Sequence, residues 1–225
     1  MDYQIIDLSL PVYHGMRGVE IEPNTSLDKE GYTTTKLHLY SHAGTHMDAP
    51  RHFLNDGRTM ERLELSKCIG PALVIDLTHR GPRDFLTVAD LTPYADRIHA
   101  GARLLLRTDW STHAQQPDYR THFPRISLEL AEWLVEQGVW LVGVEMPSVA
   151  ALDIYEELAG VHQTLLRAEI VIVECLADLS ALPEEVFFIA TPLKVQGGDG
   201  CPVRAVAGSR IPIGATRLRM PGRGR

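Results

Sequence analysis

The sequence has 225 residues, of which 44% are hydrophobic, and its 29 acidic and 22 basic residues give a formal net charge of −7. An acidic balance of this kind disfavours non-specific binding to nucleic acid or to an anionic membrane. The three cysteines are widely spaced and form neither a CxxC zinc pattern nor a disulfide framework. We find no signal peptide and no apolar run approaching about 18 residues, so we expect a cytoplasmic protein.

No low-complexity linker divides the chain, so we expect a single domain over residues 1–225, with a flexible basic and glycine-rich tail at 218–225. The first predicted element is an apolar-rich strand, Tyr3–Leu10, which ends before a proline. The next segment, His14–Glu30, contains two glycines and a proline and few core-forming residues. We predict that it is irregular, either a surface loop or a flap over a site. The β-branched and aromatic run Tyr32–Ser41 is then predicted to be a strand.

The stretch Tyr40–Phe53, YSHAGTHMDAPRHF, carries the chemistry-bearing residues His42, His46, Asp48 and His52 at even positions. Glycine and proline within it argue against a helix. In a straight strand His42 and His46 would lie about 13 Å apart, too far to share one ion bound at about 2.0–2.1 Å. The chain must therefore bend, and Gly44 is the residue that permits a bend. The alternative is a loop that is rich in histidine by chance.

Beyond this stretch, the chain alternates between apolar runs and helical patterns. Four short, nearly continuous apolar runs are typical of strands buried on both faces: Pro71–Leu77, Arg103–Thr108, Val139–Glu145 and Ile170–Cys175. The helix candidates are Thr87–Ile98, which contains Pro93, and Ser127–Gln137, with Ser127 as N-cap and Gly138 as C-terminal stop. This alternation predicts an α/β fold with a mixed, partly parallel sheet.

Two polar residues stand out in the last third of the chain. Glu174 interrupts an apolar strand, where a carboxylate is costly unless a cation pairs with it; Arg167 or Arg204 could be that cation instead of a metal. His162 lies on the predicted helix VHQTLLRAE, where a lone histidine is more often a core or surface residue than a ligand.

Four further features each allow a structural and a functional interpretation. His38 has the same strand parity as His42 and is either a supporting residue of the site or a plain exposed histidine. Glu145 closes an apolar strand and either supports the site or is solvated. Trp110 either walls a substrate pocket or packs in the core. The GGDG sequence at Gly197–Gly200 lacks the Lys and Ser/Thr of a phosphate loop, so we interpret it as a turn.

His42 to His52 match the pattern HxGTHxDxPxH at every fixed position, and this pattern resembles that of the cyclase family of metal-dependent hydrolases. That family includes bacterial kynurenine formamidases and isatin hydrolases. His162 and Glu174 fall where kynurenine formamidases carry their remaining metal ligands, and the run PLKVQGGDGCPVRAVAG is similar to the family's C-terminal segment. The resemblance implies a swivelling β/β/α domain, and homodimers or homotetramers.

The resemblance also implies metal ligation by His42, His46, Asp48, His162 and Glu174. Imidazoles and carboxylates without thiolates suit one or two Zn²⁺ or Mn²⁺ ions in a catalytic site. A bound ion acidifies water and polarises a carbonyl group, and His52 has the pKa range of a general acid/base.

These features predict hydrolysis of a small amide, formamide, cyclic amide or lactone, of the arylformamidase type. A hydro-lyase or cyclase with the same metal, and a non-catalytic metal-binding protein, are the alternatives. The segment His14–Glu30 lacks the aromatic residues that kynurenine formamidases usually carry there, and no substrate-binding residue can be named.

Overall fold

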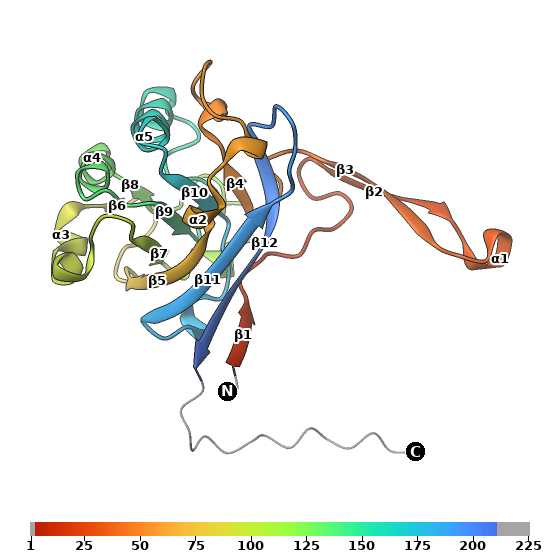
Figure 1. Cartoon of the computed structure of the whole chain (residues 1–225), viewed down its shortest axis with the longest axis horizontal. Helices are drawn as coiled ribbons and strands as arrows, with labels where there is room; N and C mark the ends of the chain where they lie inside the picture. Colours follow the sequence, from red (N-terminus) through yellow and green to blue (C-terminus); the bar gives the residue numbers. More distant parts are fainter. Residues whose placement is uncertain (1–2, 211–225) are drawn as a thin grey trace.

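The computed structural model describes residues 3–210, so the predicted tail at 218–225 lies outside the described residues. Most strands join one eight-stranded sheet in the order β1-β12-β11-β5-β7-β9-β10-β4 (Figure 1). Its strands are β1 (Tyr3–Asp7), β4 (His46–Asp48), β5 (Ile69–Asp76), β7 (Arg103–Arg107), β9 (Leu141–Val144), β10 (Val171–Glu174), β11 (Glu185–Pro192) and β12 (Gly200–Arg210).

The sheet has a parallel half and an antiparallel half. Strands β5, β7, β9 and β10 run parallel, whereas β1, β12, β11 and β5 pair antiparallel. The short strand β4 pairs antiparallel with both β10 and β12, so the sheet closes into a ring. The predicted α/β class with a mixed, partly parallel sheet is confirmed, and the arrangement is the β/β/α type that the resemblance implies.

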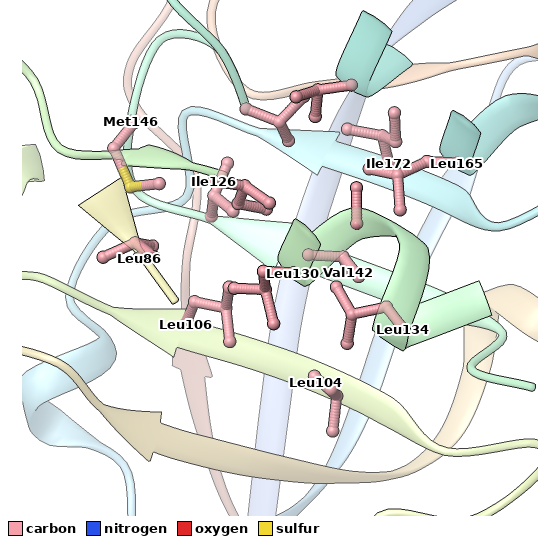
Figure 2. Packing of buried hydrophobic residues seen from close by; sticks show 14 of the residues in the cluster. Leu86, Leu104, Leu106, Ile126, Leu130, Leu134, Val142, Met146, Leu165 and Ile172 are labelled. Atoms are coloured by element: carbon pink, nitrogen blue, oxygen red, sulfur yellow. The ribbon is translucent and has the colours of Figure 1, made fainter. Parts of the chain in front are cut away.

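All four apolar runs form central strands, and each strand is buried on both faces because its residues alternate between two cores. In β7, Leu104 and Leu106 point to the core under the helices, whereas Leu105 points to the core inside the ring. Figure 2 shows the first core, where Leu130 and Leu134 pack against the sheet. Burial on both faces is what the continuous apolar runs predicted.

The helices α3 (Val88–Leu91), α4 (Leu128–Glu136) and α5 (Tyr155–Arg167) lie on one side of the sheet (Figure 1). Ser127 Oγ accepts a hydrogen bond from the backbone N–H of Leu130, which confirms the predicted N-cap of α4. Gly138 follows the helix with a φ of 68°, as predicted for its stop. The predicted helix Thr87–Ile98 divides into α3 and the 3₁₀ helix η3 (Thr92–Arg97), since Pro93 has no N–H to continue an α-helix.

The remaining elements are short. They are α1 (Leu27–Glu30), α2 (Leu65–Cys68), the strand pair β6 (Phe85–Leu86) and β8 (Arg125–Ile126), and the 3₁₀ turns η1 (Pro50–His52), η2 (Met60–Arg62), η4 (Trp110–His113) and η5 (Leu179–Ala181). None of the helices within the described part of the chain is long and apolar enough to cross a membrane.

The segment His14–Glu30 differs from the prediction of an irregular loop. Residues Val19–Thr25 form strand β2, which pairs antiparallel with β3 (Thr34–Leu39), and α1 follows at the tip. This hairpin projects away from the body of the molecule (Figure 1). Pro23 lies beside a shift in register, an irregularity that an exposed two-stranded hairpin tolerates. The prediction was wrong because the partner strand, rather than the local sequence, makes β2.

Candidate active site

The histidine-rich stretch folds as a bend, a short strand and a turn. Gly44 has a φ of 60°, a left-handed conformation that glycine adopts without strain, so the predicted bend between His42 and His46 is present. Strand β4 then carries His46 and Asp48. Pro50 begins the turn η1, which returns His52 towards the same centre.

The register of β4 brings distant residues to this bend. His46 lies directly opposite Glu174 of β10, and directly opposed residues project to the same face of a sheet. His162 reaches the same place from α5, where its ring stacks on Phe53 with centroids 4.4 Å apart. The two arginines that were the alternative to a metal do not pair with Glu174, because Arg204 pairs with Asp7 and Arg167 contacts Gln163.

Four buried side chains converge at the inner end of the site: His46, Asp48, His162 and Glu174. His46 Nε2 lies 3.3 Å from Glu174 Oε2 and 3.6 Å from Asp48 Oδ1. His162 Nε2 lies 3.5 Å from Glu174 Oε1 and 3.7 Å from Asp48 Oδ2. Ligand atoms placed tetrahedrally at about 2.0–2.1 Å from one ion lie about 3.3–3.4 Å apart, so the cluster has the spacing of a metal site.

The hydrogen bonds around this cluster also fit a cation. His46 Nδ1 donates to Gly44 O and His162 Nδ1 donates to Leu158 O, both at 2.8 Å. In the neutral imidazoles each Nε2 therefore carries a lone pair, and this lone pair faces carboxylate oxygens. Asp48 Oδ2 is buried and has no hydrogen-bond partner among the described residues. A divalent cation would satisfy these converging acceptors, and none of them is a thiolate.

A second group lies on the outer side of Asp48 and consists of His42, His52 and Asp199. His42 Nδ1 lies 2.9 Å from Asp48 Oδ1, and its Nε2 lies 2.9 Å from Asp199 Oδ2. The rings of His42 and His52 are 4.0 Å apart, and His52 Nδ1 lies 3.7 Å from Asp199 Oδ2. Asp48 thus belongs to two sets of residues that could each hold an ion, one with His42 and His52 and one with His46 and Glu174.

The electrostatics of the two groups differ. Burial disfavours charged His46 and His162, but it is outweighed at His46 by the Cys175 side chain and Glu174, and at His162 by Glu174 and Asp48, so the pKa of both imidazoles is raised. Burial would likewise raise the pKa of Glu174, yet its contacts with His162 and His46 hold that pKa far below its usual range. In contrast, burial lowers the pKa of His52 by more than the charge of Asp48 raises it, and the charges of His42 and His162 lower it further. His52 is therefore the histidine most easily kept neutral.

Sequence reasoning missed Asp199, which was interpreted only as part of a turn. The loop does turn, but Gly200 pairs with Asp48 across β12 and β4, and this register places Asp199 next to His42 and His52. A side chain at Gly200 would approach the His42 ring to 2.6 Å, so only glycine fits beneath that ring. An acidic residue inside a glycine-rich turn was the only signal in the sequence.

A cavity of about 160 Å³ opens beside His42. One wall comes from residues 10–17, including Tyr13 and Arg17, and the other from residues 114–120, including Gln115 and Arg120. Tyr13 Oη donates to Gln115 Oε1 at 3.4 Å and links the two walls. No residue of this cavity other than His42 was a candidate in the sequence.

The structure decides the interpretations left open for Glu145, Trp110 and His38. Glu145 is buried and accepts hydrogen bonds from Thr108 N, Asp109 N and Ser111 Oγ at 2.8, 2.6 and 2.9 Å. Trp110 packs in the core and donates to the carbonyl oxygen of Tyr119 at 3.0 Å, so it supports the cavity wall from behind. His38 is exposed on the hairpin, 4.0 Å from Glu22, and is remote from the cluster of Asp48.

Glu145→Ala is expected to lower the free energy of unfolding by about 2–5 kcal/mol, because it leaves buried backbone N–H groups without an acceptor. The Asp109 backbone, held at a φ of 57°, would lose one of its supports. Urea unfolding measures the change. Glu145→Gln keeps an acceptor oxygen and should cost less, whereas equal losses for both variants would contradict this account.

Known proteins resemble this chain in both sequence and structure. Residues 6–151 match the family model Cyclase, whose description reads "Putative cyclase". A protein named kynurenine formamidase from Bacillus mycoides (strain KBAB4) is 34% identical over 210 residues, which cover 90% of this chain and 96% of that protein. Isatin hydrolase A from Labrenzia aggregata, solved with benzyl benzoate, has a TM-score of 0.82 at 26% identity, covering 92% of this chain and 93% of its own. A structure described as a potential metal-dependent hydrolase with cyclase activity has a TM-score of 0.76 at 27% identity, covering 94% and 100%.

The fold, the converging imidazoles and carboxylates, and these similarities make the chain an enzyme of the metal-dependent hydrolase class. It belongs to the Cyclase family, since the family model spans more than half of the chain and the kynurenine formamidase match covers most of it. The resemblance carried by His42 to His52 is thereby confirmed.

Proposed function

We propose that this enzyme hydrolyses the C–N bond of a small formamide or cyclic amide, or the ester bond of a lactone, with the kynurenine formamidases as its functional type. One observation carries the proposal: the Nε2 atoms of His46 and His162 lie 3.3–3.7 Å from carboxylate oxygens of Asp48 and Glu174, and one of these oxygens, Asp48 Oδ2, is buried without a hydrogen-bond partner among the described residues. Such a set of acceptors needs a cation. Its chemistry suits a catalytic site better than a structural one.

We propose that the metal is Zn²⁺ or Mn²⁺ and that each chain binds two ions rather than one. Nitrogen and oxygen ligands without thiolate support either ion. His46, His162 and Glu174 would hold the inner ion, His42 the outer one, and Asp48 would be shared between them. The position of Asp48 Oδ1 between His42 Nδ1, at 2.9 Å, and His46 Nε2, at 3.6 Å, supports the higher count.

A divalent cation held here would act as a Lewis acid and would lower the pKa of a water molecule. Within this proposal, His52 acts as general acid/base: its lowered pKa keeps the imidazole neutral, ready to accept a proton from the attacking water. His52 Nδ1 faces Asp199, which leaves Nε2 for this transfer. His52 then returns the proton to the leaving nitrogen as the C–N bond breaks, which gives a carboxylate and an amine.

Hydrolysis can be tested with a panel of N-formylkynurenine, isatin, cyclic imides and unsaturated lactones, with Zn²⁺ or Mn²⁺ added, in ¹⁸O-labelled water. We expect label in a new carboxylate for at least one compound. Ring closure or loss of water without label would favour the cyclase or hydro-lyase alternative, and the absence of any product would favour a metal-binding protein without catalysis. The relatives named kynurenine formamidase and isatin hydrolase make the first two compounds the first assays.

We also propose a homodimer or homotetramer, supported by the two faces of the projecting hairpin. Paired residues on one face are charged or polar, such as Glu20 opposite His38, whereas the pairs on the other face are apolar: Val19 with Leu39 and Ile21 with Leu37. Leu37 remains 59% exposed. A two-stranded hairpin is marginally stable alone and requires packing on its apolar face. A second copy of the chain would provide that cover.

Leu37→Lys is expected to shift the protein to a smaller oligomer, because it places a charge on the apolar face of the hairpin. His38→Lys is the matched control, with the same new side chain on the adjacent position of the opposite face, and should leave the oligomer unchanged. Light scattering after gel filtration measures both masses. A monomeric wild type, or equal masses for all three proteins, would contradict the proposed assembly.

For its location we propose the cytoplasm. The three cysteines, Cys68, Cys175 and Cys201, are buried and free, as suits a reducing compartment. Fractionation of the native cells measures the location directly.

A further inference from the structure

The geometry points to a substrate that carries a carboxylate group, bound by Arg17 and Arg120 in the cavity beside His42. This inference rests on the proposed function, since the same cavity would hold the scissile carbonyl group at its inner end. It narrows the substrate from any small amide or lactone to an anionic one.

Arg17 and Arg120 differ from the other arginines of the molecule. Between residues 3 and 208, every other arginine side chain has an oxygen acceptor of the chain within 4.0 Å, such as Asp90 for Arg80 and Glu157 for Arg125. Within the same range, neither Arg17 nor Arg120 has a hydrogen-bond acceptor or an ion-pair partner. The two arginines without acceptors therefore lie in one cavity.

The positions of these arginines suit a ligand between them. Arg17 comes from the wall formed by residues 10–17, and Arg120 comes from the opposite wall formed by residues 114–120. Arg17 is exposed and lies over the ring of Tyr40, 5.4 Å from its centroid, whereas Arg120 is half-buried. No aspartate or glutamate is among the described residues that line the cavity. The site is thus locally positive in a chain with a net charge of −7.

The chemistry of guanidinium favours a carboxylate as the missing partner. Its planar fork donates two parallel hydrogen bonds to a carboxylate, and a half-buried guanidinium without an acceptor is costly. The cavity volume of about 160 Å³ suits a small substrate. The buried carboxylates at the inner end repel an anion. The carboxylate group of the substrate is therefore expected at the arginine end, with the carbonyl group towards His42.

The test compares two formamides that differ by one carboxylate, 3-formamidobenzoate and formanilide, with metal-loaded protein. The measured quantity is the ratio of kcat/KM for the acid to kcat/KM for the neutral compound. Arg17→Gln and Arg120→Gln should each lower this ratio about 10-fold or more, the effect of losing a charge-assisted hydrogen bond. Arg120→Lys should recover part of it. The control Arg97→Gln removes an arginine that pairs with Glu185, outside the residues that line the cavity, and should leave the ratio unchanged.

Comparison with the wild type cancels any difference in intrinsic reactivity of the two compounds. A double variant, Arg17→Gln with Arg120→Gln, that keeps the wild-type ratio would overturn the inference. If the wild type hydrolyses neither compound, calorimetry with 3-aminobenzoate decides the inference apart from the hydrolase proposal. A dissociation constant raised about 10-fold in the double variant, but not in Arg97→Gln, supports the inference, and equal constants reject it.

Discussion

His52→Ala should lower turnover by about 10²–10⁴-fold while the metal content stays intact, the usual contribution of a positioned general acid/base. His52 lies at the outer edge of the cluster, where its side chain is more exposed than those of His42, His46 and His162 and is free to exchange protons. It is still buried enough for its pKa to be lowered. Steady-state kinetics on the best substrate of the panel and mass-spectrometric metal analysis of the same sample measure the two quantities.

A matched control is His79→Ala, which removes an exposed histidine that pairs with Asp90 away from the site. Its turnover and metal content should match the wild type. Loss of metal from His52→Ala would make His52 a ligand, as its grouping with His42 and Asp48 allows, and the proton would then be carried elsewhere.

His46→Ala is expected to lose most of the bound metal and, with it, the activity. The imidazole is fully buried, donates its Nδ1–H to Gly44 O and directs Nε2 at both carboxylates, so its removal leaves two buried anions with less compensation. Metal analysis after purification in metal-replete medium gives the ratio of ions to chains. Circular dichroism shows whether the variant has folded.

His162→Ala is the companion variant, because apart from the shared Asp48 it contacts no ligand of the proposed outer ion, whereas the ring of His46 also packs against that of His42, with centroids 5.0 Å apart. The number of bound metal ions should fall from two to one per chain. A wild type that never exceeds one ion at saturating metal would reject the shared role of Asp48, and a folded wild type that remains empty would reject the metal site itself.

Local chemistry made part of the site predictable from the sequence. Ligand spacing required a bend, and Gly44 was the residue able to make it, so the bend could be placed without any partner strand. Glu174 could be recognised as a candidate ligand because a carboxylate within an apolar run needs a counter-ion. Ser127 and Gly138 marked the ends of α4 for equally local reasons.

The rest depended on contacts between distant segments. Strand β2 exists because β3 pairs with it, whereas its own Pro23 and the two glycines just before it indicated a loop. Asp199 reaches His42 only through the register of β12 against β4, which no local pattern records. Both walls of the cavity belong to segments about 100 residues apart, 10–17 and 114–120, so Arg17 and Arg120 could not be recognised as a pair.

The residues at strand β4, which closes the ring, tolerate less change than the residues of the cavity walls. Asp48 lies on the seam where the ring closes, with β10 on one side and β12 on the other, so a substitution that opens the seam loses the reaction centre and the fold together. The cavity walls at 10–17 and 114–120 lie outside this seam. If the proposed cavity binds the substrate, mutations there would change the substrate while the ring continues to hold the reaction centre, so this architecture could acquire new substrates and keep its reaction chemistry.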